Sequence, residues 1–221
     1  MPDIAGNINY LKSQLPSTVK LVAVSKTKPV SNIMEAYNAG QRFFGENRVQ
    51  ELLNKKDLLP RDIKWHLIGH LQTNKVKYIV PFINMIQSVD SYKLLITINT
   101  EALKIEKAVD CLLQIHIATE QTKFGFTMQE LCENLEQDDV LNLKNVRICG
   151  VMGMATYTSD KEQVSKEFAY LADCFRTLEN KYFKGFPYFK EISMGMSGDY
   201  ETAMKEGSTI IRIGSNIFGE R

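Results

Sequence analysis

The chain has 221 residues, 44% of them hydrophobic, and a formal net charge of +1. This length accommodates one large domain or two small ones, whereas the near-neutral charge argues against a dedicated nucleic-acid-binding protein. The chain contains no apolar run of membrane-spanning length and no pattern of a secretory signal, so we expect a cytoplasmic protein. The four cysteines lie far apart and form no C-x-x-C pair, which predicts reduced thiols and no metal site.

The first predicted strand lies between two predicted helices. Apolar residues recur at helical spacing over residues 4–15, so we predict an N-terminal helix that covers the closed end of the fold. Residues 21–24 form an apolar run typical of a strand buried on both faces, and the strand ends before Lys26 and Pro29. A second helical pattern follows and ends near Gly40. Lys26 is therefore expected at the carboxyl end of the first strand, where ligands bind in α/β folds.

Lys26 has two interpretations at this point. A lysine against apolar walls can lose its proton and attack an aldehyde as an amine nucleophile, forming a Schiff base. The alternative is a solvated lysine at a strand end, like Lys28 two residues further on. Taken alone, this stretch favours the solvated lysine.

The rest of the chain alternates predicted strands with predicted helices. Strands are predicted at residues 42–45, 64–68, 84–89, 111–117, 146–152, 189–194 and 208–214. Helices are predicted at residues 49–56, 74–80 and 199–206, and a long one follows residue 160. Capping-box patterns at 127–130 and 159–162 predict two of the helix starts, with Thr127 and Ser159 as the capping residues.

The predicted elements indicate the fold class. Eight strand–helix units without a break in composition predict a single domain over residues 1–221 with a parallel sheet. Eight such units in this length are typical of a (β/α)₈ or TIM barrel, here with an extra N-terminal helix. An open doubly wound sheet is the alternative. Such a sheet normally has a glycine-rich first turn, and residues 25–28 contain no glycine.

The loops after the seventh and eighth predicted strands suit a phosphate group. Barrels of this kind often bind phosphate between these two loops, at the N-terminus of a short helix. Gly195 and Ser197 follow the seventh strand, and Gly214 and Ser215 follow the eighth. Backbone N–H groups and the positive end of a helix favour an anion there. Two ordinary helix caps are the alternative, but the presence of both features in both loops favours an anion site.

Arg212 lies near the end of the last predicted strand, between apolar neighbours. Strand alternation places Ile210, Arg212 and Gly214 on one face. Because a guanidinium keeps its proton, a buried arginine needs an acceptor, which is either an acidic residue of the barrel or a ligand atom. An aldehyde-reactive lysine, a phosphate site and an inward arginine together suggest pyridoxal 5′-phosphate (PLP) as the cofactor.

His66 and His70 lie four residues apart on or near a strand, where they could share a face. No acidic or cysteine ligand with suitable spacing stands beside them, so we expect a positioned polar pair rather than a metal site.

Five motifs resemble those of a known family. They are residues 21–29 (LVAVSKTKP), 44–47 (FGEN), 68–75 (IGHLQTNK), 193–199 (SMGMSGD) and 212–219 (RIGSNIFG). In this order and spacing, and over nearly the whole chain, they resemble the pyridoxal phosphate homeostasis proteins, the YggS/PROSC family. The resemblance implies a single barrel similar to the N-terminal domain of alanine racemase, with PLP as its cofactor.

The resemblance also implies roles for individual residues. Lys26 matches the lysine that holds PLP as a Schiff base, Arg212 the arginine that faces the pyridine nitrogen, and Asn47 a residue beside the cofactor. The phosphate-binding loops are matched by Met196, Ser197, Gly214 and Ser215.

The arginine matched by Arg212 affects whether a protein of this family can use PLP for catalysis. An arginine at the pyridine nitrogen should keep that nitrogen unprotonated, because two cations would otherwise face each other, and this weakens the ring as an electron sink. Racemases of similar fold tolerate such an arginine, but they need acid–base groups on both faces of the substrate, and in alanine racemase one of these is a tyrosine from a second domain. This sequence ends at Arg221, directly after the eighth strand. We therefore expect a non-catalytic, monomeric PLP carrier that buffers PLP or delivers it to PLP-dependent client enzymes, with no nucleic-acid or membrane partner. A PLP-dependent amino-acid racemase is the alternative, and a cofactor-free Schiff-base aldolase using Lys26 is a weaker one.

Overall fold

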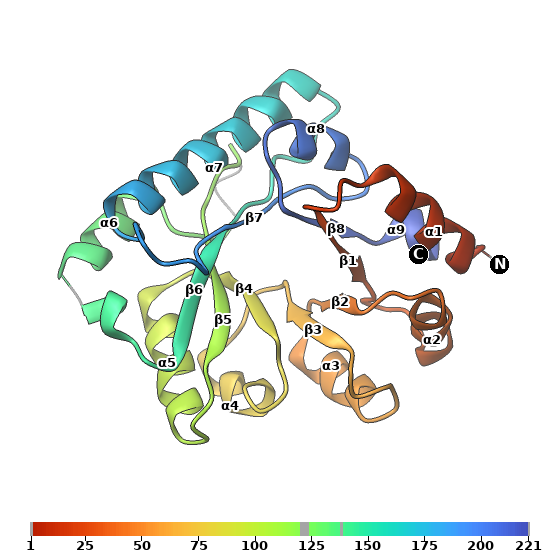
Figure 1. Ribbon diagram of the computed structural model, residues 1–221, viewed down its shortest axis with the longest axis horizontal. Coiled ribbons are helices and arrows are strands. Elements are labelled where there is room, and N and C mark those ends of the chain that lie inside the picture. The colour runs from red at the N-terminus through yellow and green to blue at the C-terminus, as the bar shows by residue number, and fades with distance from the viewer. Residues whose placement is uncertain (1, 120–123, 138, 221) are drawn as a thin grey trace.

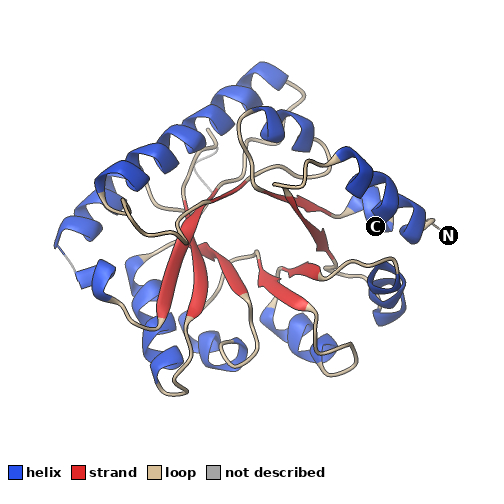
Figure 2. Cartoon of the chain, viewed as in Figure 1, coloured by secondary structure: helices blue, strands red, loops and turns tan. Residues whose placement is uncertain are grey.

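Short apolar runs at regular intervals form parallel strands, which close into a barrel (Figures 1 and 2). The computed structural model describes residues 2–119, 124–137 and 139–220. The strands are β1 (Lys20–Val24), β2 (Phe43–Glu46), β3 (Lys64–Leu67), β4 (Met85–Val89), β5 (Val109–Gln114), β6 (Val146–Met152), β7 (Glu191–Ser193) and β8 (Ile210–Ile213). Lys20 pairs with Ile210 and Ala23 with Ile213, which closes β8 onto β1. The predicted (β/α)₈ barrel is confirmed, and the open sheet is excluded.

Helices surround the strands on the outside of the barrel (Figure 2). The helices are α1 (Ile4–Gln14), α2 (Val30–Asn38), α3 (Val49–Lys56), α4 (Val76–Ile79), α5 (Tyr92–Leu103), α6 (Met128–Gln137), α7 (Lys161–Lys181), α8 (Tyr200–Lys205) and α9 (Ser215–Phe218). The described residues also form two 3₁₀ turns, η1 (Thr73–Lys75) and η2 (Asp139–Asn142). In the part of the chain that the structure describes, no helix combines the length and the apolar character that crossing a membrane requires.

Helix α1 does not cover the closed end of the barrel, contrary to the prediction. It lies on the outer wall beside α2 and α9 (Figure 1), with Ile4, Ile8 and Leu11 buried. The side-chain amide of Asn7 donates to the carbonyl of Ile217 in α9 at 3.0 Å. The physical reason is the length of α9: a helix of four residues cannot cover β8 and β1, and α1 covers the remaining apolar surface.

One of the two predicted capping residues is wrong by one position. At α6, Thr127 and Glu130 form the expected capping box, with reciprocal backbone bonds of 2.9 and 3.2 Å. At α7, however, the capping residue is Asp160 rather than Ser159. The Asp160 carboxylate accepts the backbone N–H groups of residues 162 and 163 at 3.0 and 3.1 Å. A carboxylate has the advantage over a hydroxyl there because its charge also interacts favourably with the positive end of the helix.

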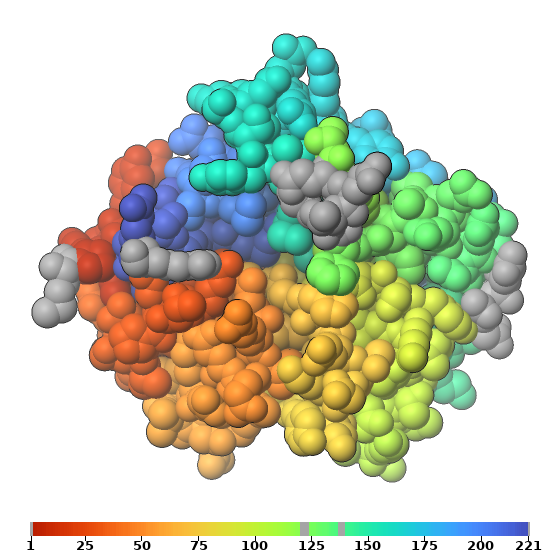
Figure 3. Space-filling model, turned by 180° about the vertical axis from the view of Figure 1, so that it is seen from behind, coloured from red at the N-terminus to blue at the C-terminus, as the bar shows by residue number. Residues whose placement is uncertain are grey.

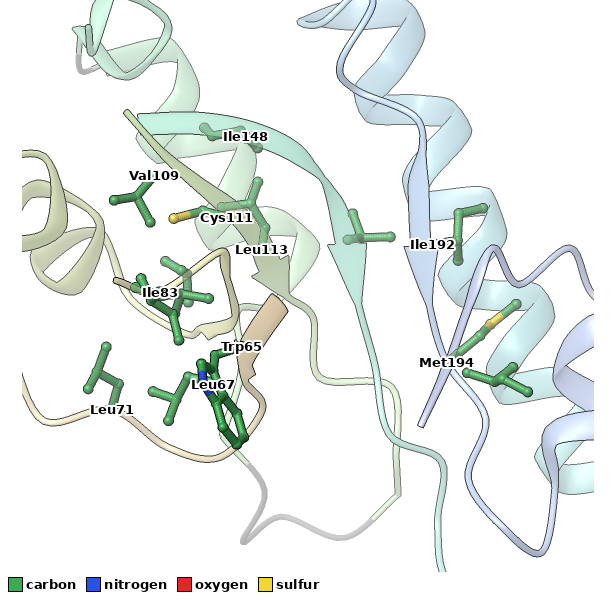
Figure 4. Close-up of a cluster of buried hydrophobic side chains, with 14 of the residues drawn as sticks. Trp65, Leu67, Leu71, Ile83, Val109, Cys111, Leu113, Ile148, Ile192 and Met194 are labelled. Atoms are coloured by element: carbon green, nitrogen blue, oxygen red, sulfur yellow. The ribbon is translucent and has the colours of Figure 1, made fainter. Parts of the chain in front are cut away.

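Apolar side chains pack on both sides of the strands. The barrel interior holds Val22, Met85, Leu112, Cys149, Met152 and Ile210. A larger cluster fills the space between strands and helices, and Figure 4 shows part of it, including Val109, Cys111 and Leu113 of β5. On β8, Ile211 and Ile213 belong to this outer cluster, which confirms the predicted alternation and leaves Arg212 on the inner face with Ile210.

Candidate ligand-binding site

A cavity of about 630 Å³ opens at the carboxyl ends of the strands. Figure 3 shows this end of the molecule, with the segment after β1 (orange-red) beside the segment after β8 (dark blue). The residues predicted for the site come together around this cavity from the ends of β1, β2, β7 and β8. They are Lys26, Asn47, Met196, Ser197, Arg212, Gly214 and Ser215.

Lys26 lies two residues beyond the end of β1, in a tight turn. The N–H of Lys28 donates to the carbonyl of Ser25 at 3.0 Å, and Thr27 adopts a positive φ of 64°. Ser25 is fully buried and bonds to Glu46 on the outer side of the strands, whereas Lys26 lines the cavity. The alternation of the strand therefore continues into the turn and directs Lys26 towards the cavity.

Lys28 is not the solvated lysine that the sequence suggested. Its ammonium group donates to the carbonyls of Phe218, Gly219 and Glu220 at 3.0 to 3.2 Å. These carbonyls lie at and just beyond the carboxyl end of α9, where a cation is favoured. Lys28 thus ties the turn after β1 to the segment after β8, and both border the cavity.

The loops after β7 and β8 bond to each other. The N–H of Gly214 donates to the hydroxyl of Ser197 at 3.2 Å, and the amide of Asn216 donates to the Ser197 carbonyl at 3.0 Å. Gly195 has a positive φ of 94°, and a Cβ there would lie 2.6 Å from the side chain of Ala203, so the turn requires glycine. The two loops form one polar wall of the cavity, to which Ser197 and Ser215 contribute hydroxyl groups.

Arg212 is 4% exposed and is held by neutral acceptors. Its guanidinium donates to the hydroxyl of Ser193 at 2.5 Å and to the carbonyl of Gly153 at 2.9 Å. Burial lowers the pKa of Arg212 to about 10, with Asp199 acting in the opposite direction, so the guanidinium stays charged at neutral pH. Since neither bonded acceptor carries a charge, the positive charge of Arg212 remains available to a ligand in the cavity.

A continuous series of hydrogen-bonded side chains runs from Arg212 through the interior of the barrel. The hydroxyl of Ser193 donates to Oε1 of Gln87 at 2.6 Å, and Nε2 of Gln87 donates to Nδ1 of His66 at 2.8 Å. His66 must therefore be neutral, and burial lowers its pKa to about 3. We call Arg212, Ser193, Gln87 and His66 the interior relay. It fixes the orientation of the guanidinium through directional bonds.

The expected pairing of His66 with His70 is wrong. His66 points into the barrel, whereas His70 contacts Asp90 at 2.7 Å and stacks on Phe124, with ring centroids 4.2 Å apart. The strand ends at residue 67, so the spacing of four does not place the two rings on one strand face.

Asn47 supplies an unsatisfied polar atom. Its Oδ1 is buried and has no hydrogen-bond partner among the residues that the structure describes. Its backbone is packed closely against Gly69, where a Cβ would lie 2.5 Å from the Asn47 carbonyl oxygen. A buried polar atom without a partner is costly, and because Asn47 lines the cavity, a bound ligand could supply that partner.

Further cavity residues were not predicted from the sequence. They are Val24, Thr27, Lys28, Ile68, Met154, Tyr157, Gly219 and Glu220. Six of these stand inside or directly beside the motifs already singled out, so their positions in the motifs were the available signal: Val24, Thr27, Lys28, Ile68, Gly219 and Glu220. Met154 and Tyr157 come from the loop after β6, which carries no recognisable ligand-binding pattern.

The fold and the cavity define a (β/α)₈-barrel protein with a polar ligand site at the carboxyl ends of its strands. Residues 2–221 match the family model described as the N-terminal domain of alanine racemase. The chain is 41% identical to the pyridoxal phosphate homeostasis protein of Aquifex aeolicus, over 91% of this chain and 87% of that protein. The chain thus belongs to the pyridoxal phosphate homeostasis protein family.

Two solved structures are similar to this chain in fold. PipY of Synechococcus elongatus with PLP bound has a TM-score of 0.90 and 37% identity, covering 98% of this chain and 100% of that chain. An alanine racemase of Clostridium difficile has a TM-score of 0.78 and 15% identity, covering 99% of this chain and 57% of the racemase. At that identity the racemase shows similarity of fold only.

Proposed function

We propose that this protein binds PLP in the cavity at the carboxyl ends of the strands and acts in PLP homeostasis, as a buffer or a delivery protein. The main support is that seven residues predicted from the sequence for this cofactor all line the same cavity. The names of its relatives agree: PipY is described with PLP bound, and the Aquifex aeolicus relative is named a pyridoxal phosphate homeostasis protein.

The residues of the cavity fit the chemical groups of PLP. The cofactor supplies an aldehyde that reacts with amines and an aromatic ring that can withdraw electrons. The ε-amino group of Lys26 would condense with the aldehyde, releasing one water and holding PLP as a Schiff base. The polar wall formed by the loops after β7 and β8 would bind the phosphate through Ser197, Gly214 and Ser215, with Met196 beside them. Arg212 would face the pyridine nitrogen, and the unpartnered oxygen of Asn47 would accept a hydrogen bond at the cofactor.

We further propose that turnover is small or absent. Arg212 keeps its positive charge at neutral pH and is fixed by the interior relay, so a protonated ring nitrogen beside it would be disfavoured. This weakens the ring as an electron sink. The racemase alternative would need acid–base groups at the cavity. Tyr157 lines the cavity, but 96% of the residue is exposed, so it is poorly placed to exchange a proton in a water-excluding site.

We propose a single-domain, monomeric, cytoplasmic carrier with PLP-dependent enzymes as its clients. The continuous closed barrel formed by β1 to β8 supports the single domain, because the cavity is built from both ends of the chain.

The experiment that tests this function combines binding with a search for turnover. Purified protein is titrated with PLP while visible absorbance is recorded. It is then incubated with PLP and a panel of amino acids in D₂O, and α-deuterium incorporation is measured. A carrier shows saturable binding without exchange, whereas a racemase incorporates deuterium rapidly. A protein that shows no saturable binding of PLP contradicts the assignment altogether.

A further inference from the structure

A buried charged cluster lies directly behind the turn that carries Lys26. It consists of Glu46 at the end of β2 and of Glu51 and Lys55 on α3, and we call it the α3 clamp. Glu46 is fully buried and Lys55 is only 7% exposed. Ionised groups are rarely buried to this extent outside functional sites or structural ion pairs. None of the three residues lines the cavity, so a direct role in ligand binding does not explain the cluster.

The α3 clamp holds both neighbours of Lys26. The ammonium group of Lys55 donates to the carbonyl of Ser25 at 2.9 Å, and the hydroxyl of Ser25 donates to Glu46 at 2.6 Å. On the other side, the N–H of Thr27 donates to Glu51 at 2.5 Å. These three bonds hold the residues immediately before and after Lys26, two of them through the backbone, while Lys26 itself lines the cavity.

The hydrogen bonds of Lys55 are complete. An ammonium group has three N–H donors, and Lys55 has three acceptors: the carbonyl of Ser25, Glu46 at 2.8 Å and Glu51 at 2.6 Å. Burial raises the pKa of Glu46, and hydrogen bonds from Lys55 and Ser25 oppose that increase. A buried ion pair contributes little stability compared with apolar residues of similar volume. Its directional bonds, however, define the position of the groups that it contacts.

The conformation of Thr27 shows why the turn needs such support. Its φ of 64° lies in the left-handed region, which is unfavourable for a β-branched residue. Conformations of this kind persist only where surrounding contacts impose them. Glu51 provides such a contact through the Thr27 N–H, and Lys55 in turn holds Glu51 in place.

We propose that the α3 clamp positions the reactive lysine: Lys55, Glu46 and Glu51 hold the turn after β1 so that the amine of Lys26 meets the PLP aldehyde at the correct distance and angle. This inference rests on the proposed function, because it concerns the lysine that would hold PLP. The three are positioning residues, because none of them lines the cavity. Lys55 and Glu51 act through the backbone of residues 25 and 27, and Glu46 acts through the Ser25 hydroxyl and the Lys55 ammonium group.

The test uses two disrupting variants, a rescuing variant and a matched control. Lys55→Met removes the central cation, and Glu51→Ala removes the acceptor for the Thr27 N–H. Glu51→Gln restores an oxygen acceptor at that position. The control is Lys56→Met, because Lys56 is the next residue on α3 and bonds only to Asp57, at 2.6 Å, among the hydrogen bonds of the described residues. Circular dichroism identifies a temperature at which each variant is folded.

The readouts at that temperature are the PLP dissociation constant and the rate of covalent capture, both from the visible absorbance band. We expect Lys55→Met and Glu51→Ala to weaken binding and slow capture by about tenfold to a hundredfold, as a displacement of about 1 Å at a reacting group does. Glu51→Gln should recover most of this loss, and Lys56→Met should behave as wild type. A purely structural role would lower the melting temperature without changing the capture rate of the folded protein.

Folded Lys55→Met and Glu51→Ala proteins with wild-type affinity and capture rate would overturn the proposal, and so would an equal loss in Lys56→Met. If Lys55→Met does not fold, Glu51→Ala decides, because the Glu51 side chain is 23% exposed and the buried Lys55 keeps Glu46 as an ion-pair partner when Glu51 is removed. If wild-type protein itself shows no visible band with PLP, the proposed function fails, which is a distinguishable result.

Discussion

Protonation of His66 should destabilise the fold below neutral pH. His66 is buried in the barrel interior, and its Nδ1 accepts a hydrogen bond from Gln87. Burial lowers the pKa of His66 to about 3 from an ordinary value of 6.5. The unfolded chain therefore binds a proton at a pH where the folded chain does not, and the resulting stability is present above about pH 6.5 and is lost as the pH falls towards 3.

The size of this effect follows from the two pKa values. Each pKa unit corresponds to about 1.4 kcal/mol, so the difference of about 3.5 units sets an upper limit of about 5 kcal/mol. At about pH 5, the proton bound by the unfolded chain accounts for about 2 kcal/mol of this loss. For a domain whose total stability is typically about 5 to 15 kcal/mol, this is a measurable fraction.

The assay is denaturant unfolding of wild type and of His66→Asn near pH 7.5 and near pH 5. Asparagine keeps an acceptor close to the position of Nδ1 but does not titrate, so the variant retains every other ionisable group. Wild type should lose about 2 kcal/mol more than His66→Asn between the two pH values. An equal loss in both proteins would refute the reasoning, because it would mean that His66 does not need to stay neutral.

Three further predictions concern backbone geometry, helix capping and the polar wall of the cavity. Gly150→Ala should destabilise the fold by about 3 kcal/mol or more in denaturant unfolding, because φ is 146° and the new Cβ would lie 1.9 Å from the Glu191 carbonyl oxygen. A loss below about 1 kcal/mol would contradict this geometry. Asp160→Ala should lower the free energy of unfolding by about 1 kcal/mol, whereas Ser159→Ala should leave it almost unchanged. The reverse order would show that Ser159, and not Asp160, caps α7. Ser197→Ala should weaken PLP binding by about tenfold in a visible titration, through loss of a phosphate contact, and unchanged affinity would remove Ser197 from the site.

Local sequence signals were sufficient for the barrel and for most of its elements. Helix α3 and strand β6 have the predicted bounds, because their apolar patterns are bordered by residues that end them. Strand β5 covers residues 109–114 rather than 111–117, since hydrophobic character continues beyond its last regular pairing with β6. Turn and cap residues at the strand ends located the cavity, because the carboxyl ends of parallel strands meet at one end of a barrel.

Contacts between distant segments were not predictable from these patterns. Gln87 and Ser193 are 106 residues apart, and strand alternation indicates only that each side chain faces inwards, not that they bond to each other. The position of α1 depends on the shortness of α9 at the other end of the chain. Lys55 is 30 residues from Ser25 in the sequence, and only the folded structure shows that it reaches the Ser25 carbonyl.

The most direct test of the central claim is the visible absorbance spectrum of the protein with PLP, compared among wild type, Lys26→Ala and Lys28→Arg. Lys28 is the matched control because it also lines the cavity and arginine keeps its charge while removing the primary amine. The account predicts a visible band in wild type and Lys28→Arg that disappears in Lys26→Ala. A band that persists in Lys26→Ala, or a wild-type protein that stays colourless with PLP, would contradict it.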